Sequence, residues 1–293
     1  MAKPKILITG STGLIGTRIT EMLSEKYDFI PLLQSEIDIT NKMAVNARLA
    51  STEFDFLLHL AAYTNVDGAE SNKELCTSIN VEGTRNLFEV CQDKGKKMIH
   101  ISTDFVFDGR AKIDSGVGAE APRETPCYTE NSLPNPISHY GLTKYQAEQV
   151  VQDNAMIVRL SYPYRKEFAG KRDFVRTIRY LLEQGKTIQM VTDSLITPTF
   201  IDDIVMGLGY LIEHYSPNIF HLVGADSMSP FEAGQLIARI FELDEKLIQP
   251  TTYAEYFKGK ALRPQWARIV NTKEEIVMST FSDGLKATSK KLI

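Results

Sequence analysis

Short apolar runs alternate with longer amphipathic stretches along the first half of the chain. The runs favour strands, and the stretches between them repeat apolar positions at helical spacing. Five runs are predicted to be strands: Lys5–Ile8, Phe29–Leu33, Phe54–Leu60, Lys97–Ser102 and Ala155–Leu160. Strands that are apolar on both faces and separated by helices form parallel sheets covered on both sides. The pattern therefore predicts an α/β fold with a doubly wound parallel sheet.

The second half of the chain keeps helical patterns but loses the regular alternation. Asp202–Glu213 and Ser229–Phe241 are predicted to be helices. The second of these opens with Ser229, Pro230 and, at the third helical position, Glu232, which is a capping box with proline at the first helical position. From about Pro163 the expected strands are short and unevenly spaced. We expect a smaller second domain that is intertwined with the first.

Composition and charge exclude several classes of protein. The chain has 293 residues, 43% of them hydrophobic, and its net charge of −4 without a basic block argues against a nucleic-acid surface. The longest apolar runs, such as Phe56–Ala62, are far shorter than the ~20 residues of a membrane helix, and no secretory signal is recognisable. Three cysteines without CxxC spacing argue against a disulfide scaffold or a metal site. We expect a cytoplasmic protein.

Glycines stand at three-residue spacing in the turn between the first strand and the first helix. The turn consists of Gly10, Ser11, Thr12, Gly13, Leu14, Ile15 and Gly16. Glycine there permits a tight turn, lets backbone N–H groups approach a pyrophosphate and lets the helix pack on its strand. A glycine-rich turn without a ligand is the alternative. Its place between strand and helix favours a Rossmann-type dinucleotide site.

The end of the second expected strand bears on the choice of dinucleotide. An acidic residue there would bind the adenosine ribose of NAD. The chain instead has Gln34 and Ser35, and its nearest carboxylates are Glu36 and Asp38. A ribose phosphate is thus permitted, and Arg18 either reaches it or is a solvated helix residue. We expect NADP or NAD as cofactor, with a slight preference for NADP.

Tyr140 and Lys144 form a candidate catalytic pair. Their four-residue spacing puts them on one face of a predicted helix that continues through Val151. An ammonium beside a phenol lowers the pKa of the phenol, so the tyrosine can give a proton to a carbonyl oxygen while a hydride reaches the carbon. The same spacing on a surface helix also arises by chance.

Ser102 and Thr103 end the fourth expected strand, where a doubly wound sheet offers its ligand crevice. Hydroxyls there either hydrogen-bond a substrate carbonyl or merely begin the loop. The glycine turn, this strand end and the Tyr140–Lys144 pair follow one another in the correct order. We therefore interpret them as one site.

On these motifs the chain resembles the extended short-chain dehydrogenase/reductase family, and within it the dTDP-4-dehydrorhamnose reductase group. The resemblance covers nearly the full length and is strongest before residue 205. Besides the motifs above it rests on His59–Glu70, Asn80–Thr84, Ser102–Gly109 and Thr197–Thr199. Of these, Ser102–Gly109 is the stretch most specific to the reductase group.

The resemblance implies a role for each matching residue. Thr103 would hold the substrate carbonyl, Tyr140 would donate the proton, and Lys144 would tune the tyrosine and bind the nicotinamide ribose. The other residues implied in the cofactor site, for which ordinary packing is the alternative, are Asp38 and Ile39 at adenine, Ala61, Ala62, Tyr63, Ser102 and, through its helix, Asn80. Asp67 and Glu70 face either substrate or solvent.

The implied reaction is the NAD(P)H-dependent reduction of a nucleotide-activated 4-keto sugar, as in dTDP-rhamnose biosynthesis. The partner is then a small nucleotide sugar, with no nucleic acid and no membrane, and a homodimer is compatible with this reading. An epimerase would use Thr103 and Tyr140 too. A non-catalytic regulatory subunit, similar to the β subunit of methionine adenosyltransferase, would bind dinucleotide without turnover. Dehydration is disfavoured because Phe105 follows Asp104 where dehydratases carry a second carboxylate.

The chain departs from the reductase group on the substrate side. Phe105 stands where the group usually has tyrosine, and Leu160–Tyr164 replaces a segment that typically carries tryptophan. Arg110–Thr125 reads as an extra surface loop beside the active site, either functional or a tolerated insertion. A substrate pyrophosphate would need cations, and the candidates are Arg165, Lys166, Arg172, Arg176 and Arg263.

The motifs divide the chain unequally. We expect residues 1–162 to form the dinucleotide-binding domain and 197–224 to return to it. Residues 163–196 and 225–293 are expected to form the substrate-binding region.

Overall fold

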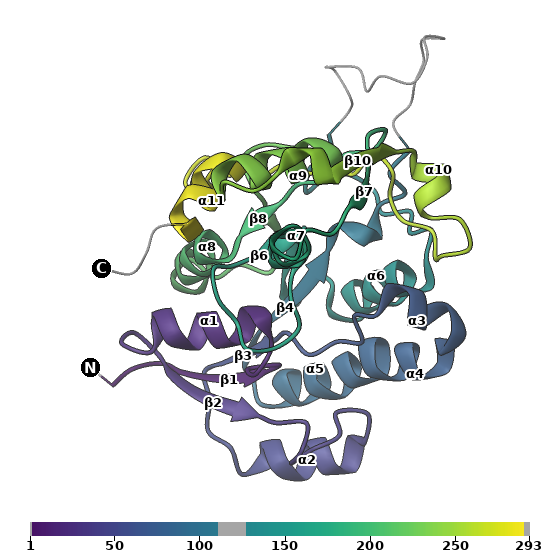
Figure 1. Ribbon diagram of the computed structural model, residues 1–293. Helices are drawn as coiled ribbons and strands as arrows, with labels where there is room; N and C mark the ends of the chain where they lie inside the picture. Colours follow the sequence, from purple (N-terminus) through teal and green to yellow (C-terminus); the bar gives the residue numbers. More distant parts are fainter. Residues whose placement is uncertain (1, 111–126, 290–293) are drawn as a thin grey trace. The chain divides into compact units, whose positions relative to one another are not determined.

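A parallel sheet with helices on both faces confirms the predicted doubly wound α/β class. The structure is a computed structural model that describes residues 2–110 and 127–289 (Figure 1). Its six-stranded sheet has the order β2-β1-β3-β4-β5-β9. The strands are β1 (Lys5–Thr9), β2 (Asp28–Leu32), β3 (Phe56–His59), β4 (Lys97–Thr103), β5 (Met156–Leu160) and β9 (Ile219–His221). The five runs expected as strands are β1 to β5.

The order of the strands locates the ligand crevice. β1 pairs in parallel with both β2 and β3, so the chain runs outward in one direction from β1 and then in the other. A ligand binds outside the carboxyl ends of the strands at such a switch point. Thr9, His59 and Thr103 end β1, β3 and β4, and these three residues therefore stand at the edge where the ligand belongs.

Helices cover this sheet on both faces. α1 (Leu14–Leu23) lies on the face opposite α5, as Figure 1 shows. The others before β5 are α2 (Lys42–Ala50), α3 (Val66–Ser71), α4 (Lys73–Thr77), a π-helical turn (Ser78–Glu82), α5 (Gly83–Asp93), a 3-10 turn (Asp104–Val106) and α6 (His139–Val151). Leu49 of α2, Leu87 of α5 and Val151 of α6 pack with Leu7 and Leu57 of the strands in one fully buried core. Among the described residues no helix is long and apolar enough to cross a membrane.

Most of the later elements contribute to a second core. They comprise the parallel pairs β6 (Pro163–Tyr164) with β8 (Thr199–Phe200) and β7 (Ile188–Val191) with β10 (Ile248–Thr251), and the helices α7 (Phe174–Glu183), α8 (Ile201–Glu213), α9 (Pro230–Ile240), α10 (Tyr253–Tyr256) and α11 (Phe281–Ser289), with a 3-10 turn (Glu245–Leu247). Ile178, Ile237 and Phe281 from three of these helices meet in this core. The capping box predicted for α9 is present: Ser229 accepts the Glu232 N–H, and the Glu232 carboxylate accepts the Ser229 N–H.

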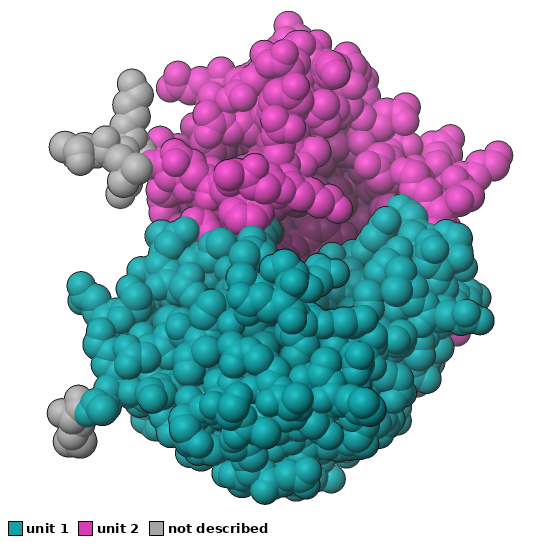
Figure 2. Space-filling model, turned by 90° about the horizontal axis from the view of Figure 1, so that it is seen from below, with its two compact units in different colours: residues 1–106, 134–159, 208–220 teal, residues 107–133, 160–207, 221–293 magenta. Residues whose placement is uncertain are grey.

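The chain divides into two compact units, coloured separately in Figure 2. Unit 1 contains residues 1–106, 134–159 and 208–220, and unit 2 contains 107–133, 160–207 and 221–293. These boundaries differ from the expected ones in two ways. Of the expected return segment 197–224, only 208–220 belongs to unit 1, and residues 107–133, expected in the first domain, belong to unit 2. Packing explains the second difference: Phe107 stacks on Tyr128 at 4.2 Å, and Tyr128 bridges to Ile269.

A buried ion pair joins α6 to β5 within unit 1. The Nε and Nη2 atoms of Arg159 donate to the two carboxylate oxygens of Glu148 at 2.9 and 2.7 Å. The side chains are 1% and 4% exposed. Because the two charges compensate each other in a low dielectric, removal of one leaves the other without compensation.

We predict that Glu148→Leu lowers the free energy of unfolding by about 3–5 kcal/mol, since it leaves the Arg159 charge buried without its carboxylate. The double variant Glu148→Leu/Arg159→Met removes both charges and recovers most of the loss. Urea unfolding of the wild type, both single variants and the double variant measures this. A double variant as unstable as the single ones contradicts the prediction.

Candidate active site

The glycine turn brings backbone against backbone between β1 and α1. Gly10 has a φ of +67°, a conformation that glycine adopts without strain. A Cβ on Gly16 would collide with the Gly10 carbonyl oxygen. Gly13 is the N-cap of α1, so no side chain caps the helix. The turn therefore presents a helix N-terminus, with its partial positive charge, at the switch point of the sheet.

The Thr9 hydroxyl fastens the loop that follows β3. The N–H groups of Leu60 and Ala61 both donate to Thr9 Oγ1 at 3.1 Å, and His59 Nδ1 lies 2.7 Å from the same oxygen. A Cβ on Gly10 would stand 3.0 Å from the Ala61 nitrogen. The segment that contains Ala61 and Ala62 is therefore held directly beside the glycine turn.

Asn80 ties the same loop to α6. It is buried in the π-helical turn, where its Oδ1 accepts the Tyr63 N–H at 2.7 Å and its Nδ2 donates to the Tyr63 carbonyl at 3.2 Å. Nδ2 also donates to Thr143 Oγ1 at 2.9 Å. Single π turns are frequent at functional sites. These bonds give Asn80 a physical means for its expected role, that of stabilising the site through its helix.

Thr103 and Tyr140 meet at the carboxyl end of β4. The Thr103 side chain lies near enough to the Tyr140 phenol to lower its pKa, and the Thr103 hydroxyl donates to Asp104 Oδ1 at 2.9 Å. Gly141 allows this approach, because a Cβ there would collide with the Phe105 carbonyl oxygen. Both side chains are buried. Two of the three expected catalytic groups are thus close together.

Lys144 lies one turn further along α6 and is also buried. Its Nζ donates to the Ile101 carbonyl at 2.7 Å and lies 3.2 Å from His100 Nε2. No hydrogen bond joins Lys144 to Tyr140 within the described part of the chain. In this state the ammonium is held by β4.

Burial governs the acidity of both groups. It raises the pKa of Tyr140 above its ordinary value; the nearby Thr103 hydroxyl counteracts this and the charge of Asp104 adds to it. Burial lowers the pKa of Lys144 to about 8, against the opposing effects of Glu148 and Cys76. The expected lowering of the Tyr140 pKa by Lys144 is not found in this structure, because the phenol is desolvated and the ammonium is bonded to His100 and Ile101. A phenol that keeps its proton at neutral pH is suited to donate it.

The adenosine side of the expected site is a turn after β2. Asp38 Oδ1 accepts the Thr40 N–H and hydroxyl at 2.9 and 2.8 Å, and the Ile39 carbonyl accepts from Asn86 of α5 at 2.9 Å. Arg18, the candidate for a ribose phosphate, forms an ion pair with Glu21 at 3.1 Å. In this structure Arg18 is therefore a partly solvated helix residue.

Some residues expected on the substrate side make contacts within unit 1, and others make contacts within unit 2. Phe105 packs its ring edge-on against Tyr140 at 5.5 Å, and Glu70 accepts the His139 N–H at 2.8 Å, so that it holds the start of α6. Arg176 is paired with Asp173 at 2.7 Å within unit 2, which accounts for its charge. Most of the expected loop Arg110–Thr125 lies outside the described residues.

Two residues near the site were not identified from the sequence. His59 and His100 are buried on β3 and β4 beneath Lys144, within runs that are otherwise apolar. A polar residue inside such a run was the available signal, since a buried polar group needs a hydrogen-bond partner.

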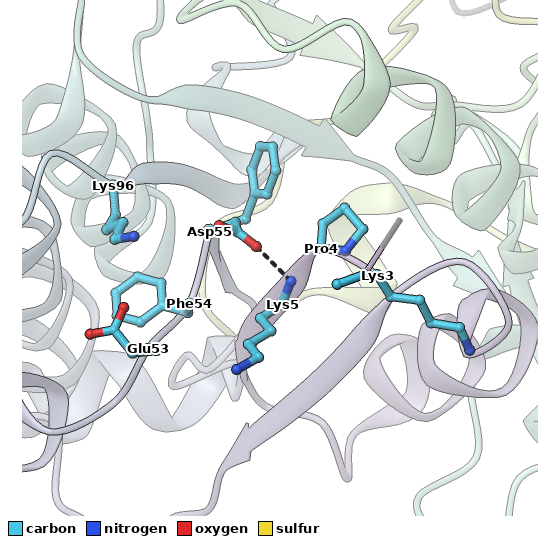
Figure 3. A pocket seen from close by; sticks show the side chains of 9 residues that line it. Lys3, Pro4, Lys5, Glu53, Phe54, Asp55 and Lys96 are labelled. Carbon is cyan, nitrogen blue, oxygen red and sulfur yellow. Dashed lines mark hydrogen bonds between the residues drawn. The ribbon is translucent and has the colours of Figure 1, made fainter.

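A pocket of about 640 Å³ lies at the opposite end of the sheet, where the strands begin (Figure 3). It is lined by the residues that begin β1 and precede β3 and β4, among them Lys3, Lys5, Asp55 and Lys96. Asp55 accepts the Lys5 N–H at 2.8 Å. Because these are amino ends of strands, the pocket is distinct from the crevice that a doubly wound sheet uses for ligands.

The residues at the crevice fit a nicotinamide dinucleotide. Ser11 Oγ in the turn and Ser102 Oγ at the end of β4 are buried and have no hydrogen-bond partner among the described residues. A buried hydroxyl without a partner is costly unless a ligand uses it. The glycine turn and the N-terminus of α1 suit a pyrophosphate. The described residues contain no group of three His, Cys, Asp or Glu side chains that could hold a metal ion.

Comparison with known proteins gives consistent results. The RmlD substrate binding domain family matches residues 4–292. A dTDP-4-dehydrorhamnose reductase of Mycolicibacterium smegmatis is 32% identical, over 84% of this chain and 72% of the relative. A probable low-salt glycan biosynthesis reductase of Haloferax volcanii is 29% identical, over 88% and 87%. The crystal structure of the dTDP-4-dehydrorhamnose reductase from Bacillus anthracis in complex with NADP has 30% identity and a TM-score of 0.86, with 98% of this chain and 99% of that chain covered.

We predict that Gly16→Ala weakens dinucleotide binding at least about fivefold, since the added methyl forces the helix away from the turn and a shift of this kind costs about 1 kcal/mol or more. Isothermal titration with NADPH measures the affinity. Gly209→Ala is the control, because a Cβ there would stand in ordinary van der Waals contact with Leu23 at 3.6 Å and alanine favours a helix. Unchanged binding in Gly16→Ala would show that the turn does not hold the pyrophosphate.

Proposed function

This chain belongs to the RmlD substrate binding domain family, and from that we propose that it is an NADPH-dependent reductase of a nucleotide-activated 4-keto sugar, similar to dTDP-4-dehydrorhamnose reductase. The observation that carries the proposal is the proximity of Thr103 to Tyr140, one helical turn from Lys144, at the same sheet end as the glycine turn. A ketone reductase needs a hydride donor, a proton donor and a group that orients the carbonyl. The NADP-bound reductase that this chain resembles over nearly its whole length supports the choice of NADPH.

The proposed mechanism assigns one step to each side chain. NADPH, when bound, supplies the hydride for the carbonyl carbon. Tyr140 donates its phenolic proton to the carbonyl oxygen, and the Thr103 hydroxyl turns from Asp104 to the same oxygen. Lys144 compensates the phenolate that remains until solvent returns the proton. A hydride and a proton have then been added, and the ketone has become an alcohol.

Two alternatives are separated from the reductase by one screen. Nucleotide-activated 4-keto sugars are offered with NADPH, and its oxidation is followed by absorbance. We expect oxidation with at least one of them. An epimerase would carry a tightly bound dinucleotide and consume no NADPH, whereas a binding subunit would bind NADPH and turn nothing over. Either of those results would replace the reductase proposal.

We predict that Tyr140→Phe lowers ketone reduction by about 10²–10⁴-fold, the usual contribution of a general acid. The affinity for NADPH is expected to stay within about threefold of the wild type, because the change removes one oxygen atom and leaves the ring packed against Phe105. Steady-state rates and a fluorescence titration with NADPH measure the two quantities. Turnover equal to that of the wild type would remove Tyr140 from its role.

We predict that kcat/KM for NADPH falls as the pH rises through about 8, because Lys144, whose pKa is lowered to about 8, loses its charge there in the cofactor-free protein. The same group affects stability. The unfolded chain binds the proton more tightly than the folded one, so stability contributed by this site rises with pH between about 8 and 10.5. Lys144→Met should lower the rate and abolish the limb near pH 8. A limb that survives in this variant belongs to another group.

A further inference from the structure

Two buried histidines lie beneath the ammonium of Lys144. His59 on β3 and His100 on β4 stand opposite each other in the register of the two strands, with ring centroids 5.4 Å apart. They are 1% and 0% exposed. Apolar residues at these positions would bury no polar group, whereas each imidazole must be desolvated and hydrogen-bonded, so the imidazoles call for a further explanation.

The bonds around His59 determine its tautomer. Thr9 Oγ1 accepts two backbone N–H groups, from Leu60 and Ala61, which occupy both of its lone pairs. The Thr9 hydroxyl must then donate its hydrogen bond to His59 Nδ1, which accepts it. On the other side of the ring, Thr84 donates its hydroxyl to the Asn80 carbonyl at 2.7 Å and accepts from His59 Nε2 at 3.0 Å. His59 is therefore neutral, with its proton on Nε2.

The bonds around His100 determine the opposite tautomer. A lysine ammonium has three donors and no acceptor, so the Nε2 atom of His100, 3.2 Å away, must accept. The proton of the ring is then on Nδ1, which is buried and has no hydrogen-bond partner among the described residues. His100 keeps this costly N–H while its other nitrogen serves Lys144. An imidazole that satisfied only its own packing would not bear that cost.

We propose that His100 is a positioning residue for Lys144: with the Ile101 carbonyl it takes two of the three N–H groups of the ammonium and so fixes the direction of the third. The inference rests on the proposed function, because it concerns the direction in which Lys144 offers its remaining N–H to the reacting groups. His59 supports His100 from the neighbouring strand. Its own bonds continue through Thr84 to Asn80, which holds α6 by Thr143.

Burial and the neighbouring ammonium keep both imidazoles neutral. Burial and the charge of Lys144 lower the pKa of His59 to about 3, and burial, Lys144 and His59 lower that of His100 well below its ordinary value. The groups that face Lys144 from the elements packed against it are His100 and His59 of the strands, Glu148 and Tyr140 of α6 and Cys76 of α4. Glu148 is paired with Arg159, so it compensates Lys144 only partly.

Nitrogen NMR of histidine-labelled, cofactor-free protein tests the geometry without any activity measurement. The chain has 5 histidines, and His59→Gln and His100→Gln assign the two signals of interest. At a pH below the pKa of Lys144 we expect His59 protonated on Nε2 and His100 protonated on Nδ1. A His100 ring with its proton on Nε2 cannot accept from the ammonium, and that result would overturn the proposal.

Two substitutions at His100 then separate positioning from packing. His100→Leu keeps an apolar volume but removes the acceptor, and we expect it to move the alkaline limb of kcat/KM for NADPH about one unit lower in pH, since a hydrogen bond that favours the ammonium is lost. His100→Gln places an amide oxygen near the position of Nε2 and should restore most of the shift. His221→Leu is the matched control, because it removes a buried imidazole bonded to Val270 within unit 2.

The outcomes are distinguishable from a failure of the proposed function. If the wild type reduces none of the sugars, the reductase proposal fails, and the NMR tautomers together with the NADPH affinities of His100→Leu and His100→Gln still decide the role of His100. We expect at least about fivefold weaker NADPH binding in His100→Leu than in His100→Gln. Equal limbs and affinities in the two variants, with melting temperatures lowered as in His221→Leu, would show that His100 only packs.

Discussion

The arrangement of the site depends on how polar groups are satisfied where three parallel strands end. At the carboxyl ends of these strands the backbone leaves the hydrogen bonds of the sheet, and each N–H that points inward needs another acceptor. Thr9 Oγ1 is the acceptor for the N–H groups of Leu60 and Ala61, and the Thr9 hydroxyl donates a hydrogen bond to His59 Nδ1. The bonds continue to Thr84 and Asn80 and end on α6. The glycine turn, the loop after β3 and the helix that carries Tyr140 are thereby fastened to one another.

Exclusion of water gives these residues their chemical character. In a polar solvent a phenol and an ammonium titrate at similar pH, but here burial raises the pKa of Tyr140 and lowers that of Lys144. The phenol therefore keeps its proton at neutral pH while the ammonium approaches the range in which it can lose one. Each buried charge nearby has a partner: Lys144 has His100 and Ile101, and Glu148 has Arg159. Such pairing is what allows charged groups to occupy the interior at all.

The sequence was informative wherever a property is local. The five strands, the helix from His139 to Val151 and the capping box at Ser229 lie where the pattern predicted them. The four-residue spacing of Tyr140 and Lys144 placed both residues on one helix face. Thr103, at the end of β4, lies near Tyr140, as the order of the motifs predicted. The unit boundaries were less predictable, because they depend on contacts such as Phe107 with Tyr128 that no local pattern encodes.

By itself the sequence determined the fold class and predicted the glycine turn as a dinucleotide site and three side chains as candidate catalytic groups. The physical reason is that alternation, glycine spacing and helical periodicity act over a few residues. Only the tertiary structure decided what surrounds those side chains. His59 meets Thr9, and His100 meets Lys144, across separations of 50 and 44 residues. Strand register sets such pairs, and the burial they share decides which protons Tyr140, Lys144 and the two histidines carry.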